Sequence, residues 1–491
     1  MGDLKMDWTM TENQLMLGPK LSLGEMALRM VLSNSWHDFD ILTSLQSIQF
    51  RSIYDGKFED VCQPFVDQIK EKVYGLGLPE SLKQKTTHLF KPLLLDILEW
   101  KVFHERFFFN SGGHFDVSIL EQMCWTSVGS VDYQKTAEKL ARVETLDVVK
   151  RYELTCLYCL LDYIPILWEE LPDEVKRAET ARFPTLGRDT SLEYYWAQCV
   201  KGKDADISPT YLKEISFLKN AFEFAACTGN VTATTYFFHK LPVEKRDPFL
   251  YRTVHFVIAE RDGNPFSKRF HFPKKKCSEV LRYLLYLMRP DHRNQVLRER
   301  PAAVLTCFLD WPLQDYFLDV ADFIFGFLPV GLYSDVESCI SKRINATGYY
   351  CPDLIQSLFL RCPVRFREEI VCDFDFFRFI IRNDDTETLQ VILRNIDLGS
   401  RPLNSAHWFV ELLRRLSEWE KLDLVELCIR EKALSKKRLK EVKEALKKFH
   451  PDNTSREDTL FFTAEQIRRL DLEWRRFFDL LDKLEASVPG K

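Results

Sequence analysis

The feature that most constrains the fold of this chain is an apolar run that closes on a proline and recurs along the sequence. The pairs that end such runs are Leu78-Pro79, Leu171-Pro172, Leu241-Pro242, Leu328-Pro329 and Cys362-Pro363, with a related Met288-Arg289-Pro290. Proline fits poorly inside a helix but well in its first turn. Each of these sites therefore predicts the end of one helix and the start of the next.

The spacing of these prolines indicates a helical repeat. From Pro172 onward the intervals are 70, 48, 39 and 34 residues, so two fall near a unit of 34 to 39 residues, 70 is close to two units, and 48 breaks the period. A basic residue also stands four positions after several of the prolines, at Lys83, Lys176, Arg246 and Arg367. A period in this range is typical of stacked helical hairpins.

The clearest single hairpin lies in residues 220–246. Gly229 can take the positive φ that closes a helix, Asn230 tolerates the same region, and Pro242 ends the second helix. Spacing of three and four residues predicts the buried face of that second helix, formed by Val231, Thr235, Phe238 and Leu241. One such hairpin has too little apolar surface to be stable alone, so neighbouring hairpins must cover it.

Several segments resemble the ankyrin repeat, a 33-residue turn and two helices that opens with T-P-L-H-x-A. Residues 225–230 resemble the end of the first helix and its turn, and residues 401–406 keep the Pro, Leu and Ala of the opening. Residues 389–393 and 424–429 resemble the second helix. Two residues that are 36 positions apart stand where the turn glycine would be, namely Asp384 and Glu420.

The chain also departs from the ankyrin pattern. No complete opening motif is present, the turn glycine is kept once, and the segment after Ala406 is longer than a consensus repeat by about ten residues. The resemblance covers parts of residues 220–433. Another type of helical solenoid explains the same pattern, and an unrelated all-helical fold is the remaining alternative.

These patterns predict an all-α fold with four regions. Residues 1–21 are expected to be loosely ordered, and residues 22–140 to form an N-terminal helical region that begins with the capping box of Ser22 and Glu25. Residues 141–433 are expected to form a helical-hairpin repeat array. Residues 434–491 are expected to form C-terminal helices that cap it, because a solenoid needs a terminal element with a polar outer face.

Composition narrows the class of protein. The 491-residue chain has a net charge of -5, which gives no whole-chain attraction to nucleic acid or anionic membranes. Its 13 cysteines form no disulfide framework, and no apolar run reaches the length of a membrane helix. Without a secretion signal pattern, the expected location is the cytoplasm, with the nucleus as an alternative.

Catalytic motifs are missing from the sequence, which predicts a non-enzymatic protein without a cofactor or metal. The C-x-x-C of residues 156–159 lacks a second cysteine pair and is interpreted as helix packing. His104-Glu105 and the His114 and Asp116 pair could each offer a base and a carboxylate, but a structural role is preferred. An enzyme whose site is assembled from distant residues remains a third hypothesis.

Phenylalanines are concentrated at one place in the expected array. Phe374, Phe376, Phe377 and Phe379 could form an exposed binding strip, but helices of a solenoid bury their aromatic faces, so core packing is the preferred interpretation.

Two basic clusters are the candidate partner-binding residues. The first consists of Lys268, Arg269, Lys274, Lys275 and Lys276, and the second of Lys436, Lys437, Arg438 and Lys440 on an amphipathic helix expected over residues 435–449. Residues 430–448 carry nine Lys or Arg and three Glu, a local net charge of +6 that leaves -11 for the rest of the chain. The preferred function is protein–protein interaction through a helical repeat surface, with nucleic-acid binding as the alternative. Solvated helix faces are the simplest explanation of both clusters.

Overall fold

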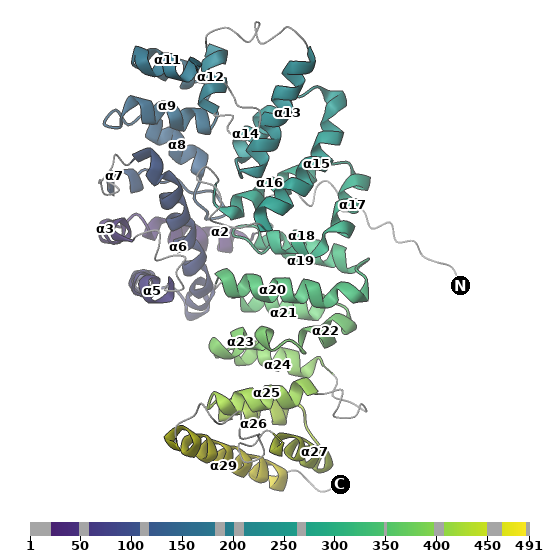
Figure 1. Ribbon diagram of the computed structural model, residues 1–491. Helices are drawn as coiled ribbons and strands as arrows, with labels where there is room; N and C mark the ends of the chain where they lie inside the picture. Colours follow the sequence, from purple (N-terminus) through teal and green to yellow (C-terminus); the bar gives the residue numbers. More distant parts are fainter. Residues whose placement is uncertain are drawn as a thin grey trace. The chain divides into compact units, whose positions relative to one another are not determined.

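The computed structural model describes residues 21–48, 58–108, 117–181, 192–200, 211–262, 272–347, 351–396, 407–448 and 464–487. Within these ranges the chain forms α-helices, one short 3-10 helix and no β-strand, which confirms the all-α prediction (Figure 1). None of the helices described is both long and apolar enough to cross a membrane.

The chain divides into two compact units, and the division falls inside the region expected as one array. Unit 1 comprises Met1–Gly326 with Arg343–Tyr349, and unit 2 comprises Phe327–Lys342 with Tyr350–Lys491. The helices of unit 1 are α2 (Leu23–Ser35), α3 (Phe39–Ser47), α5 (Phe58–Gly75), α6 (Glu80–Phe108), α7 (Val117–Leu120), α8 (Tyr133–Ala141), α9 (Val148–Leu157), α10 (Ile164–Glu170), α11 (Asp173–Ala181), α12 (Leu192–Val200), α13 (Tyr211–Cys227), α14 (Val231–Lys240), α15 (Val243–Asp262), α16 (Lys274–Leu287), α17 (Pro290–Glu299), α18 (Pro301–Cys307) and α19 (Gln314–Phe325).

Unit 2 continues the series of short helices. It contains the 3-10 helix η1 (Val330–Leu332), the first part of α20 (Tyr333–Thr347), α21 (Pro352–Arg361), α22 (Val364–Ile370), α23 (Phe374–Arg382), α24 (Thr386–Arg394), α25 (His407–Glu418), α26 (Leu422–Glu431), α27 (Lys436–Lys447) and α29 (Ala464–Ser487). Figure 1 shows α23 to α29 as successive rows of helices within this unit.

The expected hairpin around Gly229 is present as α13 and α14. Gly229 has a φ of 81°, and the side chain of Asn230 caps α14 by accepting the N–H of Ala233 at 3.0 Å. The buried face differs from the prediction, because it is formed by Ala233, Thr234, Phe237, Phe238 and Leu241. Val231 and Thr235 are only half-buried. The side chains of Ala233 and Thr234 are small enough to fit against neighbouring helices. The spacing of larger apolar residues does not predict that such small residues are buried.

The basic residue that follows several prolines has a structural role. Lys176 donates to the carbonyl of Glu169 at 2.9 Å, Arg246 to that of His239 at 3.0 Å, and Arg367 to that of Leu360. In each case the acceptor lies seven residues earlier, in the last turn of the helix that the proline terminates. The last four carbonyls of a helix have no partner within it, and a cation near them is also favoured by the helix dipole.

The two residues expected at turn-glycine positions adopt left-handed backbone. Asp384 has a φ of 49° between α23 and α24, and Glu420 has a φ of 58° between α25 and α26. Asp385 then caps α24 by accepting the N–H of Thr388 at 2.9 Å. Left-handed backbone at these two positions, 36 residues apart, gives the two hairpins the same local turn.

Other local predictions can be compared directly with the helices. Ser22 and Glu25 form the expected capping box, and Leu439, Val442 and Leu446 form the buried side of α27. The aromatic strip is core: Phe376, Phe377 and Phe379 are at most 7% exposed. The side chain of Phe374 lies outside the described residues.

Candidate functional site

The first basic cluster is largely interior. Lys268 and Arg269 lie outside the described residues, whereas Lys275 is 7% exposed and its Nζ lies 2.5 Å from both Asp96 Oδ1 and Glu99 Oε2. Burial alone would lower the pKa of Lys275, but the two carboxylates outweigh it and raise the pKa above its ordinary value. Lys275 is therefore protonated, and its two ion pairs link α16 to α6.

Lys276 is also withdrawn from solvent. Its Nζ lies 2.6 Å from Glu279 Oε1 and 4.1 Å from the ring centroid of Tyr133. Lys274, which precedes this pair, is half-buried. A cation that binds a partner must be accessible to it. The expectation of an exposed basic patch is therefore wrong for Lys275 and Lys276. Carboxylates of their own unit offset the free-energy cost of removing these two ammonium groups from water.

The second basic cluster is exposed but partly neutralised. Lys436, Lys437 and Lys440 are exposed on α27, and the Nζ of Lys440 lies 3.9 Å from Glu485 of α29. Arg438 is half-buried and pairs with Glu441 at 3.1 Å. The nearby lysine at 443 is enclosed by Asp482 and Glu485. Acidic residues of α29 therefore offset part of the net charge of +6 that is counted over residues 430–448.

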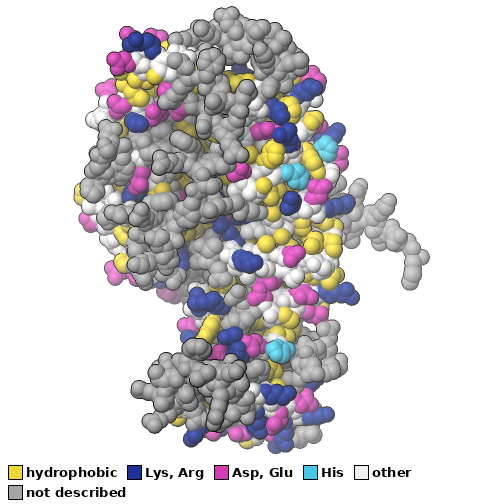
Figure 2. Space-filling model, viewed as in Figure 1, with side chains coloured by type: hydrophobic (Ala, Val, Ile, Leu, Met, Phe, Trp, Pro, Cys, Tyr) yellow, Lys and Arg dark blue, Asp and Glu magenta, His cyan; other side chains and the backbone are white. Residues whose placement is uncertain are grey.

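Figure 2 shows Lys and Arg side chains interspersed with Asp and Glu over the described parts of the visible face. Nucleic-acid binding draws its affinity from several unpaired cations that face the phosphate backbone together. On this face the mixed pattern is typical of a solvated surface.

The C-x-x-C pair packs as expected. Cys156 is fully buried, and Cys159 is 8% exposed with a φ of 49° just beyond the end of α9. Burial raises the pKa of Cys159 to about 12, and that of Cys156 well above its ordinary value. Burial therefore disfavours the thiolate form of both cysteines, in agreement with a packing role.

His104 is committed to structural hydrogen bonds. It is fully buried, with Nδ1 at 2.7 Å from the carbonyl of Trp100 and Nε2 at 2.7 Å from the Tyr158 hydroxyl. A carbonyl can only accept, so Nδ1 carries the proton, and in the neutral ring Nε2 accepts from the Tyr158 hydroxyl. Glu105 instead faces Lys101 at 3.5 Å. The His104-Glu105 pair is not a catalytic dyad, and the His114 and Asp116 pair lies outside the described residues.

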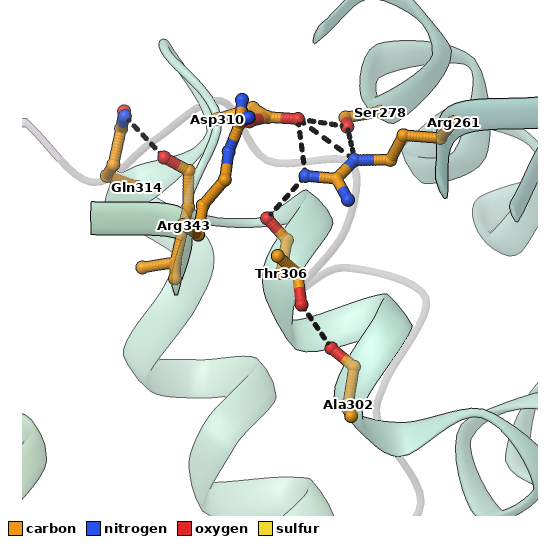
Figure 3. Close-up of polar contacts among 8 residues, drawn as sticks. Arg261, Ser278, Ala302, Thr306, Asp310, Gln314 and Arg343 are labelled. Atoms are coloured by element: carbon orange, nitrogen blue, oxygen red, sulfur yellow. Dashed lines mark hydrogen bonds and ion pairs between the residues drawn. The ribbon is translucent and has the colours of Figure 1, made fainter. Parts of the chain in front are cut away.

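A buried polar cluster joins four segments of unit 1 at Asp310 (Figure 3). Arg261 donates to Asp310 Oδ2 at 3.1 and 3.2 Å and to the carbonyl of Thr306 at 3.0 Å. Ser278 and Arg343 also donate to the Asp310 carboxylate. Burial alone would raise the pKa of Asp310, but Arg261 and Arg343 hold it below its ordinary value. Every side chain of this cluster bonds within the unit, which indicates a structural role.

A pocket of about 390 Å³ is present among the described residues. It lies in unit 1, where the loop before α8, the Gly229 turn and the starts of α16 and α19 meet. Gly229 belongs there for steric reasons, since a Cβ atom would lie 3.2 Å from atoms of Phe272, Lys276 and Cys277.

The pocket combines aromatic walls with balanced charge. Its aromatic residues are Tyr133, Tyr158, Phe272 and Tyr316, and its charged residues are Asp132, Lys276, Glu279 and Arg282. The guanidinium of Arg282 lies 5.5 Å from the ring centroid of Tyr316. No group of three or more potential metal ligands occurs among the residues described. Aromatic walls with a few charged groups are typical of pockets that bind small molecules.

No sequence pattern predicts this pocket. Gly229 and Asn230 are expected as a helix turn and Lys276 as part of a basic cluster, whereas Tyr133 and Arg282 belong to no predicted site. The sequence does allow Asp132 to be predicted as a helix cap, because an Asp that precedes a helix is a typical cap. That Asp132 lies near the Gly229 turn depends on tertiary packing.

Comparison with known proteins adds no relative. No protein-family model matches the chain, and no match to a curated protein is found.

Proposed function

We propose that this chain is a non-enzymatic protein-interaction protein that binds its partners through surfaces of its helical hairpins. The carrying observation is the recurrence of one local construction. A helix ends at proline, and a Lys or Arg four residues later donates back to the carbonyl seven positions before it. Stacked hairpins of similar construction generate extended surfaces, which solenoid proteins use to bind other proteins.

The remaining polar clusters support this proposal. His104, Asp310 and Lys275 are each satisfied by neighbours within unit 1. The ankyrin-like interpretation is one form of this proposal, supported by the left-handed residues at Asp384 and Glu420. Another helical-hairpin solenoid would serve the same function.

The proposal is tested by affinity capture of the full chain from native lysate, with and without nuclease, followed by cross-linking mass spectrometry. We expect a protein partner that survives nuclease and whose cross-links reach lysines in the described helices. Loss of every partner on nuclease treatment would favour nucleic acid instead. Turnover of a small substrate, with no reproducible partner, would contradict the proposal.

A further inference from the structure

The helix junctions α14–α15 and α21–α22 share one construction, which allows their surfaces to be compared position by position. Arg246 and Arg367 each donate to the carbonyls five and seven positions earlier, at distances between 2.6 and 3.2 Å. Each guanidinium also lies within 5.8 Å of the ring centroid of the phenylalanine eight positions before it. The two junctions therefore differ mainly in the side chains that face solvent.

The α21–α22 junction exposes two large aliphatic side chains. Leu360 is 44% exposed and Val364 is 65% exposed. Both belong to the same short turn, since Arg367 of α22 bonds to the carbonyl of Leu360 in α21. The α14–α15 junction keeps the exposed valine, as Val243, but has His239 in place of the leucine. The second aliphatic residue is therefore not required by the shared construction.

A third exposed aliphatic residue lies beside this junction in unit 2. Val330 is 46% exposed and follows a proline, as Val364 does. The ring centroids of Tyr333 and Phe366 lie 5.3 Å apart, so the start of α20 packs against α22. Three of the four large hydrophobic residues that are exposed among the described residues of unit 2 therefore lie here. Grouped apolar side chains, unlike single ones, mark interaction sites.

The charge next to these aliphatic residues is positive. Arg361 and Arg365 are exposed, and Arg365 forms no ion pair with the described residues. At the α14–α15 junction, the position of Arg365 is held by Glu244. The acidic residues of α22, Glu368 and Glu369, lie in its second half. A partner that combines apolar side chains with carboxylates complements this surface.

We propose that the α22 edge, formed by Val330, Leu360, Val364 and Arg365, docks an acidic amphipathic segment of a partner protein. Apolar side chains of that segment cover the three aliphatic residues, and its carboxylates pair with Arg365. A nucleic acid fits this edge less well, because it carries a phosphate at every nucleotide whereas the centre of the edge is apolar. The inference rests on the proposed protein-binding function and specifies the chemistry of the partner.

The test is selection of binders to the full chain from a display library of random peptides, followed by fluorescence anisotropy of the enriched peptides. We expect these peptides to combine Leu, Ile or Phe with Asp or Glu. Their affinity should fall as the salt concentration rises, because salt screens exposed charges. Enrichment of basic or uncharged peptides only would overturn the proposal.

Matched substitutions locate the site. Val364→Asp places a carboxylate among the aliphatic residues and should weaken binding at least about tenfold, while Arg365→Glu should also remove most of the salt dependence. Asp fits this position, since Asp173 follows Pro172 in the same way at the start of α11. Val243→Asp is the same change at the α14–α15 junction and should bind like the parent chain. Equal losses in Val243→Asp and Val364→Asp would contradict the assignment.

The docking site and the proposed function can fail separately. A nuclease-resistant partner that binds Val364→Asp as it binds the parent chain, with no peptide that depends on Val364, would overturn the docking site alone. Loss of every captured partner on nuclease treatment would instead overturn the protein-binding function, and with it the premise of the docking site.

Discussion

At the scale of single residues, Asp310 should be among the most sensitive positions of unit 1. It is 1% exposed and accepts hydrogen bonds from Arg261, Ser278 and Arg343. Asp310→Asn removes the charge and leaves Arg261 buried without its counter-ion. Breaking a buried ion pair in this way costs about 3 to 5 kcal/mol of the free energy of unfolding. Urea unfolding at neutral pH measures the loss.

The pH dependence of this effect has a defined sign. Because the folded protein holds the pKa of Asp310 below its ordinary value, the stabilisation is present above the unfolded pKa of about 3.9 and is lost as the pH falls through the folded pKa. The difference between parent and Asp310→Asn should therefore shrink as the pH falls below about 4. The exposed Asp162→Asn is the control, and an equal loss there would contradict the role given to Asp310.

At the scale of helical elements, the proline-associated cation determines how firmly a helix end is held. Arg246 donates to the carbonyl of Leu241 at 3.0 Å and to that of His239 at 3.0 Å, and its guanidinium lies 5.1 Å from the ring centroid of Phe238. Arg246→Met should lower the free energy of unfolding by about 1 kcal/mol, since the lost bonds are partly exposed to solvent. Thermal and urea unfolding measure this change.

Two substitutions calibrate the effect of Arg246→Met. Arg246→Lys keeps one donor, as Lys176 does naturally, and should lose less stability than Arg246→Met. Lys245→Met changes an exposed neighbour and should stay within about 0.5 kcal/mol of the parent chain. Equal losses in Lys245→Met and Arg246→Met would show that the carbonyl contacts contribute nothing.

In the turn between α26 and α27, a substitution is expected to raise the free energy of unfolding instead of lowering it. Ala433 is exposed and has a φ of 43°, a conformation that costs a non-glycine residue roughly 1 to 2 kcal/mol. Ala433→Gly removes that strain but adds freedom to the unfolded chain, so we expect a net gain of about 0.5 kcal/mol. Ala445→Gly, in the interior of α27, should instead cost about 1 kcal/mol. A loss of stability in both variants would exclude strain at Ala433.

At the scale of the whole molecule, the sequence predicts features that depend on neighbouring residues. Three such features are the capping box at Ser22, the left-handed turn at Gly229 and the helix ends before proline. Each depends on residues that are only a few positions apart in the sequence. The resemblance to the ankyrin repeat places Asp384 and Glu420 at turn-glycine positions, and both have positive φ values. Local steric and hydrogen-bonding rules are sufficient for such predictions.

Features that depend on distant residues could not be predicted in the same way. Lys275 lies in a run of lysines that suggests an exposed surface, yet its partner Asp96 is 179 residues away. The pocket has the same property, because Tyr133, Gly229 and Arg282 meet only after several hairpins have packed. One sequence shows which residues are charged, but packing decides which of those charges reach solvent.

The charge distribution leads to a final prediction about the class of partner. Reversing the exposed Lys436, Lys437 and Lys440 to Glu changes the net charge of the chain from -5 to -11, since each reversal subtracts two charges. If the chain binds proteins through its hairpins, the parent should show no salt-steep binding to DNA or RNA, and the reversed variant should behave alike. Fluorescence anisotropy across a range of salt concentrations measures this. If nucleic acid is the partner, affinity instead falls steeply with salt and is lost in the reversed variant, because each phosphate contact releases counter-ions. The same three positions changed to Gln would then lose less affinity than the reversal to Glu, which separates lost attraction from added repulsion.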